Sequence, residues 1–354
     1  MVRAIKLSKT KYKGNIFRTN FITNARSTIN VLSVIAILAV DFNIFPRRFA
    51  KTKSFGYSLM DTGVGLFIYS NGIVAPEAGG QKDSIKKCIK SSLPILLLGV
   101  ARFIFVKQID YNVPISEYGV HWNFFITLGF TKIFTSFILN VVKVKYIYIN
   151  AIFIIVAHEV LLQTGLQKFA LTNIKRDNFL VANKEGLVSC LGYICIYLFS
   201  VYFGYLLNIR NSKQGKISMA SKFVIGSFLS LIISLFLQNY FGISRRLANS
   251  AYCFWILFIG IFMTGLYYLG QIVQEFIFRD KLPDSIYSPL IFEAVNYNGL
   301  LFFLIGNVLT GLINMTFNTL TINDSISLII LVLYIFINCF VVTVLYCKQI
   351  KLKL

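Results

Sequence analysis

The strongest constraint on this fold is a series of apolar runs, each close to the ~20 residues that an α-helix needs to cross a bilayer. They recur along the whole chain of 354 residues. Charged residues make up only 14% of the sequence, against about 25% in ordinary soluble domains. A soluble protein of this size could not bury that much apolar surface in its core. The sequence therefore predicts an all-α, polytopic transmembrane helix bundle, and it excludes a soluble enzyme or a disordered chain.

Hydropathy and run length predict ten membrane spans. We expect them at Ser27–Phe45, Ser58–Val74, Ser91–Val106, Trp122–Val142, Tyr146–Gln163, Gly186–Leu207, Phe223–Tyr240, Ala248–Leu269, Pro289–Thr310 (or to Thr316) and Ile326–Tyr346. The connections between them are short. We therefore expect one transmembrane domain over residues 27–347, between a basic N-terminal tail (residues 1–26) and a C-terminal tail (residues 348–354).

The distribution of Lys and Arg predicts the orientation. With ten spans, both termini lie on one side, and the tails and loops of that side carry 22 Lys and Arg against 11 on the other. An excess of these residues marks the cytosolic side, so both tails are expected in the cytosol. The net charge of +21 then reflects membrane topology, and we expect no nucleic-acid partner.

Four polar clusters fall on the less basic, non-cytosolic side. They are Asp41–Lys51, Glu117–Asn123, Arg176 with Asn183–Gly186, and Ser244–Asn249. Polar groups at membrane depth are energetically costly and usually mark function. Four loops of the same sidedness could line one vestibule, so we expect a catalytic or transport site there.

Asp41 is the most informative single residue. Ser27–Val40 alone gives only about 21 Å of helix, so we expect the first helix to continue towards Phe45. Asp41 would then lie near a helix C-terminus, where burial and the helix dipole both disfavour its ionised form. Compensation would come from the cations that follow, Arg47, Arg48 and Lys51. Such a carboxylate is either a general base for a hydroxyl or part of an interfacial salt bridge.

Several other polar residues have a structural interpretation beside the functional one. Ser58-Leu-Met-Asp61 matches a capping box at the start of a helix. His121 could be a helix-end hydrogen bonder, or a base oriented by the flanking Glu117 and Asn123. His158-Glu159 lies inside a predicted span, where a buried polar pair between helices is expected. Neither histidine has a second ligand at metal-binding spacing, so we expect no metal site.

Taken in order, these clusters resemble one known family. The run Ile37-Leu-Ala-Val-Asp-Phe-Asn-Ile-Phe-Pro-Arg-Arg-Phe-Ala-Lys51 is similar to the most specific motif of the GPI-anchored wall transfer protein family, whose mammalian members are called phosphatidylinositol-glycan class W. The resemblance covers about residues 30 to 320, and Asn43 departs from it where the family typically has Pro. Further matching segments are Ser58–Gly65, Tyr118–Asn123, Ala182–Gly186, Arg245–Asn249 and Gly306–Asn314.

The resemblance implies an enzyme of GPI-anchor biosynthesis in the endoplasmic-reticulum membrane, with its catalytic loops facing the lumen. The family transfers a fatty acyl chain, usually palmitoyl, from acyl-CoA to the inositol ring of glucosaminyl-phosphatidylinositol. No prosthetic group is expected, and acyl-CoA, with palmitoyl-CoA as the expected form, is the co-substrate. The alternative that stays open is a membrane transporter or scramblase for a lipid or an anionic solute.

By the family pattern, Asp41 and Lys51 are the catalytic candidates. Asp41 would accept the proton of an inositol hydroxyl as it attacks the thioester carbon, and Lys51 would stabilise the developing oxyanion or hold Asp41 ionised. Residues expected to contact the substrates are Arg47, Arg48, Asp61, His121, Trp122, Asn123, Arg176, Asn183, Lys184, Glu185, Arg245, Arg246, Asn249 and Asn307.

Overall fold

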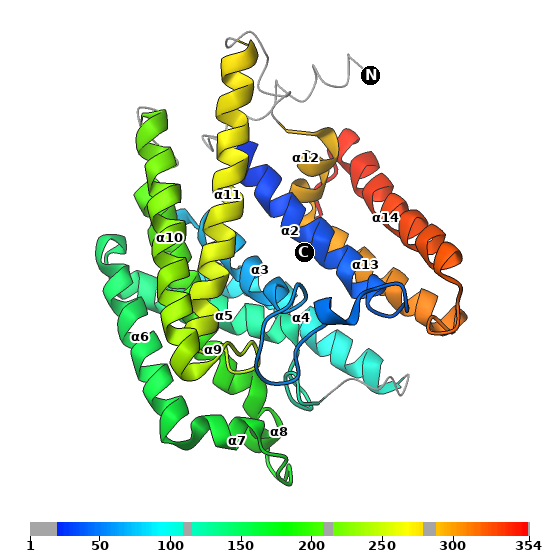
Figure 1. Cartoon of the computed structure of the whole chain (residues 1–354), viewed down its shortest axis with the longest axis horizontal. Helices are drawn as coiled ribbons and strands as arrows, with labels where there is room; N and C mark the ends of the chain where they lie inside the picture. The colour runs from blue at the N-terminus through cyan, green and yellow to red at the C-terminus, as the bar shows by residue number, and fades with distance from the viewer. Residues whose placement is uncertain (1–19, 109–114, 208–214, 279–287, 353–354) are drawn as a thin grey trace. The chain divides into compact units, whose positions relative to one another are not determined.

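The structure is a computed structural model that describes residues 20–108, 115–207, 215–278 and 288–352 (Figure 1). Throughout these ranges the regular secondary structure is helical and no strand forms, so the predicted all-α class is confirmed. Most of the predicted N-terminal tail lies outside the described residues. The chain divides into two compact units: unit 1 comprises residues 1–50 and 263–354, and unit 2 comprises residues 51–262.

Eight helices of the described residues are long and apolar enough to cross a membrane. They fall, in order, at eight of the ten predicted spans, which confirms a polytopic membrane protein. These candidate spans are Asn20–Ala39 (α2), Phe124–Val141 (α5), Val144–Leu171 (η3, α6, η4 and α7), Lys184–Leu207 (α9), Lys216–Phe241 (α10), Ser250–Phe278 (α11), Gly299–Thr316 (α13) and Asp324–Cys347 (α14).

The other two predicted spans are helical but do not meet the same criteria. At Ser58–Val74 the helix α3 covers only Thr62–Gly72, eleven residues or about 16 Å, which is too short to cross a bilayer unaided. At Ser91–Val106 the helix α4, Ile85–Gln108, is long enough, but it begins among lysines and contains Pro94. The expected full span at Ser58–Val74 is therefore wrong.

The first helix ends earlier than predicted. Helix α2 stops at Ala39, and its 20 residues reach about 30 Å because it begins at Asn20, inside the predicted tail. A turn follows, in which the Asp41 N–H donates to the Leu38 carbonyl at 3.1 Å. The expected continuation to Phe45 is thus wrong, and Asp41 lies in the turn beyond the helix rather than within it.

The guanidinium of Arg47 explains why α2 can end there. It donates to the carbonyl oxygens of Val40 at 2.7 Å and Phe42 at 3.4 Å. These carbonyls follow the last helical turn, where backbone acceptors lose their intrahelical partners. A cation at a helix C-terminus is also favoured by the helix dipole. Arg47 therefore stabilises the turn that presents Asp41.

In unit 1, helices α2, α12 (Leu290–Tyr297), α13 and α14 pack together (Figure 1). The buried hydroxyl of Tyr334, on α14, lies 3.0 Å from the carbonyl oxygen of Val34 and 3.1 Å from that of Gly306. A Cβ at Gly306 would come within 2.8 Å of the Val34 side chain, so only glycine allows α2 and α13 to approach this closely. One phenolic group thereby joins three membrane helices.

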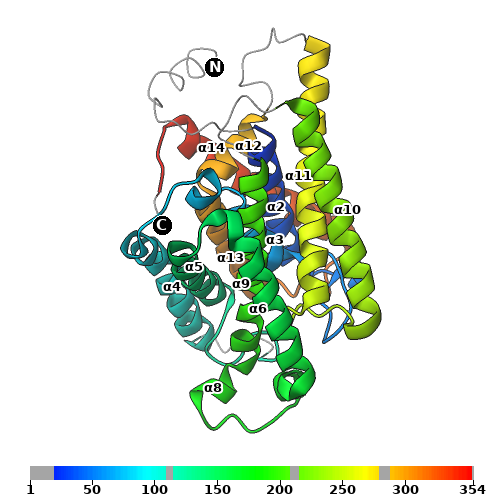
Figure 2. The ribbon, with the colours of Figure 1, turned by 90° about the vertical axis from the view of Figure 1, so that its left-hand side faces the viewer.

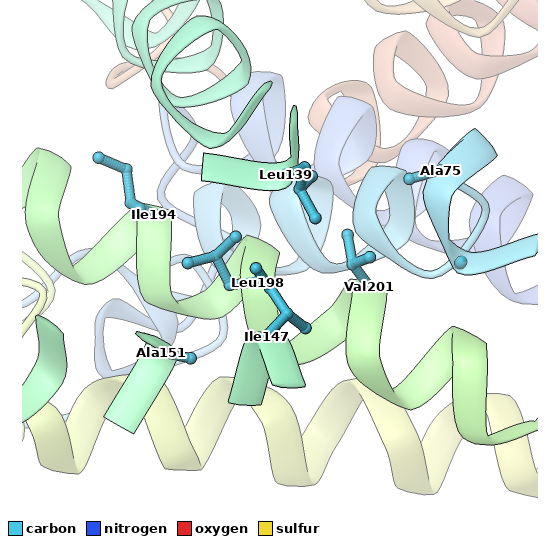
Figure 3. Packing of buried hydrophobic residues seen from close by; sticks show 8 residues of the cluster. Ala75, Leu139, Ile147, Ala151, Ile194, Leu198 and Val201 are labelled. Atoms are coloured by element: carbon cyan, nitrogen blue, oxygen red, sulfur yellow. The ribbon is translucent and has the colours of Figure 1, made fainter. Parts of the chain in front are cut away.

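In unit 2, helix α9 is central and packs against α3, α5 and α6, and α4 lies beside α5 (Figure 2). A hydrophobic core forms between α5, α6, α9 and residues 75–78, and Figure 3 shows its side chains. Its buried members are Ala75, Ala78, Leu139, Ile147, Ala151, Ile194, Leu198 and Val201. Residues 250–262 of α11 belong to this unit and residues 263–278 to unit 1.

Short helices complete the two units. Unit 1 contains η1 (Arg47–Phe49), and unit 2 contains η2 (Pro76–Gly79), η3 (Val144–Tyr146), α6 (Ile147–Leu161), the π-helical η4 (Leu162–Leu166), α7 (Gln167–Leu171) and α8 (Phe179–Ala182).

Candidate active site

Two of the predicted polar clusters are in direct contact within unit 2. The backbone N–H of Gly186 donates to the Tyr118 carbonyl at 2.9 Å, which joins residues 172–186 to residues 115–123. Gly119 has a φ of +114°, and a Cβ there would lie 2.6 Å from the Cα of Asn183. Glycine is required at this position both by its backbone conformation and by the close approach.

The segment that follows Lys51 lies against the turn between α10 and α11. The Gly56 N–H donates to the Ile243 carbonyl at 2.8 Å, and the Ser244 hydroxyl donates to the Ser54 carbonyl at 2.6 Å. Arg246 donates to the Lys53 carbonyl at 3.0 Å. These hydrogen bonds, one between backbone groups and two from side chains to backbone carbonyls, fix residues 53–56 on the turn 242–249.

A chain of ion pairs links these segments. The Lys51 ammonium lies 2.5 Å from Glu117 Oε1, the same oxygen lies 3.2 Å from Arg245 Nη1, and Arg245 Nε donates to Asp61 Oδ1 at 2.8 Å. The side chains become less exposed along this chain, from 43% for Lys51 through 13% for Glu117 and 4% for Arg245 to 0% for Asp61. Two anions balance two cations, and the Lys51 ammonium forms the exposed end.

Asp61 is fixed by more than one partner. Its carboxylate also accepts the Ser58 hydroxyl at 2.9 Å and the Thr52 N–H at 3.2 Å. Asp61 occupies the N-cap position of α3, but its side chain makes no capping hydrogen bond. The capping-box interpretation is therefore wrong, because a buried carboxylate gains more from a guanidinium than from a helix N-terminus.

Electrostatics keep the middle of the ion-pair chain charged. Burial would raise the pKa of Glu117, but the neighbouring cations Lys51 and Arg245 outweigh it and hold that pKa below its ordinary value. Burial acts to lower the pKa of Arg245, yet the Glu117 carboxylate raises it above its ordinary value. Both groups therefore stay ionised at neutral pH.

The predicted binding residues Asn123, Asn183 and Asn249 hold backbone in place. The Asn123 side chain caps α5 by accepting from Phe125 and Ile126 N–H groups. Asn183 Oδ1 accepts the His121 N–H at 2.8 Å. Asn249 Oδ1 accepts the N–H groups of Ser244 and Tyr252 at 3.1 and 3.3 Å, beside Arg245. These amides shape the loops of the candidate site.

Three predicted charged residues form a second polar group. Arg176 makes a two-pronged ion pair with Glu185, at 2.5 and 3.1 Å. The ammonium of Lys184 is buried and donates to the carbonyl of Phe169 at 2.7 Å and to that of Thr172. The contacts of Lys184 are thus those of a cap at the end of α7 and not those of an exposed phosphate ligand.

The remaining predicted residues are placed as follows. The exposed ring of His121 lies between those of Phe103 and Phe179, with centroid distances of 5.2 and 6.0 Å. The buried Trp122 donates to Thr127 Oγ1 at 2.9 Å. In unit 1, the Arg48 guanidinium covers the Phe49 ring, and Asn307 donates to the Phe303 carbonyl of its own helix at 2.7 Å.

Asp41, the other catalytic candidate, belongs to unit 1. Its Oδ2 accepts a hydrogen bond of 2.8 Å from the side-chain amide of Asn314, on α13. Asn314 was not among the predicted site residues, although it ends the last matching segment, Gly306–Asn314. Within the turn after Asp41, Asn43 also donates to the Leu320 carbonyl at 2.5 Å. The Asp41 carboxylate, which lies in a turn, is therefore held by an amide from helix α13.

The pair His158-Glu159 is buried between helices, as predicted. His158 Nε2 lies 3.0 Å from the Leu247 carbonyl, and Glu159 Oε2 accepts the Ser250 N–H and hydroxyl at 2.9 and 2.6 Å. Both side chains hold the turn that carries Arg245. In the part of the chain that the structure describes, no three His, Cys, Asp or Glu side chains come together as a possible metal site.

Comparison with known proteins places the chain in one family. The model of the GWT1 family matches residues 2–345. GPI-anchored wall transfer protein 1 of Schizosaccharomyces pombe is 39% identical over 345 residues, which cover 94% of this chain and 73% of that protein. Human glucosaminyl-phosphatidylinositol-acyltransferase PIGW is 33% identical over 366 residues, with 92% and 73% covered. The chain whose motifs and polar loops are described above is therefore a member of the GWT1 family.

Proposed function

We infer that this protein is an acyltransferase of GPI-anchor biosynthesis, which acylates the inositol ring of glucosaminyl-phosphatidylinositol. One observation carries this inference: the family match, over residues 2–345, includes the segments that hold Asp41, Lys51 and the buried ion pairs. Relatives named as glucosaminyl-phosphatidylinositol acyltransferases cover more than nine-tenths of the chain. Nothing in these relatives favours the transporter alternative.

We further propose an acyl-CoA, with palmitoyl-CoA as the expected form, as the acyl donor. The setting is the endoplasmic-reticulum membrane, where the pathway of the named relatives operates. We place the candidate loops on the lumenal side, as the family resemblance implies, because the count of Lys and Arg assumed ten full spans and α3 is too short to be one of them.

Asp41 is the proposed general base. The inositol hydroxyl oxygen attacks the thioester carbonyl carbon, its proton passes to the Asp41 carboxylate, and collapse of the tetrahedral intermediate breaks the C–S bond. The CoA thiolate leaves and takes up the proton held by Asp41, which restores the carboxylate for the next turnover. The Asn314 amide supports this role, because a donated hydrogen bond orients the carboxylate.

Lys51 is the proposed stabiliser of the oxyanion. Its ammonium is partly exposed and has three N–H donors, and the ion pair with Glu117 leaves donors available for a ligand. A positioned cation at the developing negative charge stabilises the transition state more than the ground state.

Replacement of Lys51 tests that role. Lys51→Ala is expected to lower the rate of acyl transfer by about 10²–10³-fold, the usual effect of removing one donor to an oxyanion. The rate is measured with purified protein, palmitoyl-CoA and glucosaminyl-phosphatidylinositol. Lys53→Ala, which removes an exposed lysine two residues along, serves as the control and should stay within about twofold of wild type. Equal rates for the two variants would exclude Lys51 from the reaction.

Replacement of Asn314 tests the orientation of Asp41. Asn314→Ala is expected to lower kcat by about tenfold, because the carboxylate loses the donor that fixes it while its chemistry stays intact. The matched control is Thr316→Ala on the same helix, where an exposed hydroxyl donates only to the carbonyls of its own helix. An unchanged kcat in folded Asn314→Ala would show that the amide does not orient Asp41.

The function itself is tested in liposomes that contain the purified protein, glucosaminyl-phosphatidylinositol and palmitoyl-CoA. Mass spectrometry should detect the lipid with one added acyl chain and an equal amount of free CoA. Movement of the lipid between leaflets without any consumption of the thioester would instead support a scramblase.

A further inference from the structure

We propose that Glu117 is a positioning residue for acyl transfer, which acts by fixing the ammonium of Lys51. This inference rests on the role of Lys51 proposed above and adds a residue that neither the sequence motifs nor the relatives assign. Its basis is the set of contacts that surround Lys51 within unit 2.

Lys51 is part of a closed circuit of contacts. Its side chain pairs with Glu117 at 2.5 Å, Glu117 pairs with Arg245 at 3.2 Å, and Arg245 binds Asp61 at 2.8 Å. Asp61 accepts the N–H of Thr52, the next residue of the chain after Lys51. The series of contacts therefore comes back to the backbone next to Lys51. It holds the ammonium of Lys51 through Glu117 and the following peptide group through Asp61.

Glu117 is the member that determines where the ammonium lies. A lysine side chain has four rotatable bonds, and one that is partly exposed samples many rotamers unless an anion selects among them. A single carboxylate oxygen of Glu117 contacts both cations, so Arg245 prevents Glu117 from following Lys51 into solvent. Arg245 is in turn buried and bound to Asp61. The flexible ammonium of Lys51 is thus held by Glu117, and Glu117 is held by the buried Arg245.

The same contacts also allow a purely structural role. Glu117 could do no more than join the segments 51–61, 115–123 and 242–249, in which case its loss would disturb the site whatever stands at position 51. The two roles differ in one measurable way. A positioning residue has nothing to position once the Lys51 ammonium is gone, whereas a structural residue matters equally in both backgrounds.

A kinetic double-mutant cycle separates the two. Acyl transfer is measured for wild type, Glu117→Gln, Lys51→Ala and the double variant. Glu117→Gln is expected to lower kcat by about 10- to 30-fold with the KM for palmitoyl-CoA changed less than about twofold. In the Lys51→Ala background the same substitution should change kcat by less than about twofold. The inference would be overturned if Glu117→Gln lowered kcat by the same factor with Lys51 and with Lys51→Ala. It would also be overturned if Glu117→Gln had no effect on kcat in the presence of Lys51.

Glu159→Gln is the matched control. Glu159 is a buried acid of the same unit, and its carboxylate holds Ser250 rather than a lysine. Its substitution should reduce kcat by the same factor with and without Lys51. A smaller factor without Lys51 would mean that the cycle does not isolate Glu117, and the inference would then lose its support.

Stability and the proposed function are tested separately. If Glu117→Gln does not fold, Glu117→Asp takes its place in the cycle, because it keeps the anion but shortens its reach, and the same comparison applies. Wild-type protein without acyl transfer would overturn the proposed function and this inference with it. Full activity of Lys51→Ala would overturn the role proposed for Lys51, and with it this inference, but not the acyl transfer. If Lys51→Ala loses activity but Glu117→Gln lowers kcat by the same factor with and without Lys51, this inference alone would be overturned.

Discussion

Asp41→Asn is expected to lower the rate of acyl transfer by about 10²–10⁴-fold, the usual range for removal of a general base. The amide has nearly the shape of the carboxylate but cannot accept the proton of the inositol hydroxyl. Arg47 stabilises the turn through the Val40 carbonyl, and the side-chain oxygen of an asparagine can still accept from Asn314, so the substitution should leave the fold of unit 1 intact. Turnover is measured by mass spectrometry of the acylated lipid, on protein shown to be folded by its thermal unfolding.

The control for Asp41→Asn is Asp324→Asn, which makes the same chemical change at an exposed position in the first turn of α14. This change weakens one favourable contact with a helix dipole, and the rate should stay within about twofold of wild type. Turnover of Asp41→Asn at the rate of this control would exclude Asp41 as the base.

Arg245→Ala is expected to lower the free energy of unfolding by about 3–5 kcal/mol, the usual cost of removing one partner from a buried ion pair. The guanidinium bridges Asp61, which is fully buried, and Glu117. Without it, two carboxylates of like charge remain with too few cations. Arg245→Lys should recover only part of the loss, because a single ammonium cannot reproduce a planar guanidinium that contacts both acids. Denaturant unfolding of the purified protein in detergent measures both variants.

An exposed ion pair provides the control for Arg245. Lys87, in the first turn of α4, lies 2.6 Å from Asp83, which precedes the helix, and the lysine side chain is 69% exposed. Lys87→Ala should change the free energy of unfolding by no more than about 0.5 kcal/mol. If Arg245→Ala lowered the free energy of unfolding by no more than Lys87→Ala does, the buried ion pairs would not hold the loops of unit 2 together.

The sequence was sufficient to locate most membrane helices. An apolar run of about 20 residues can satisfy its backbone groups in a bilayer only as a helix, so hydropathy alone predicted the positions of α5, α9 and α14 to within two residues at each end. The polar clusters were also predictable, since each stands between two such runs. Their identity as one family's motifs followed from residue order, which the chain-long match confirms.

The ends of elements were less predictable. Helix α2 stops at Ala39 because Arg47, eight residues further along, satisfies the carbonyls beyond its last turn. Hydropathy gives no sign of such a contact, since it depends on how the chain folds back on itself. Helix α3 begins only at Thr62, with Asp61 at its N-cap position, although the local pattern Ser58-Leu-Met-Asp61 indicated an earlier start.

The partners of the charged residues were decided by the tertiary structure alone. Asp61 and Arg245 were each predicted to belong to the site, but 184 positions separate them, and the local pattern around Asp61 indicated a capping box. Glu117 received no catalytic role from the sequence, because its contacts with Lys51 and Arg245 exist only when three distant loops meet. Membrane insertion depends on the composition of a continuous segment, which the sequence contains in full. Ion pairing depends on distance through space, and folding alone sets that distance.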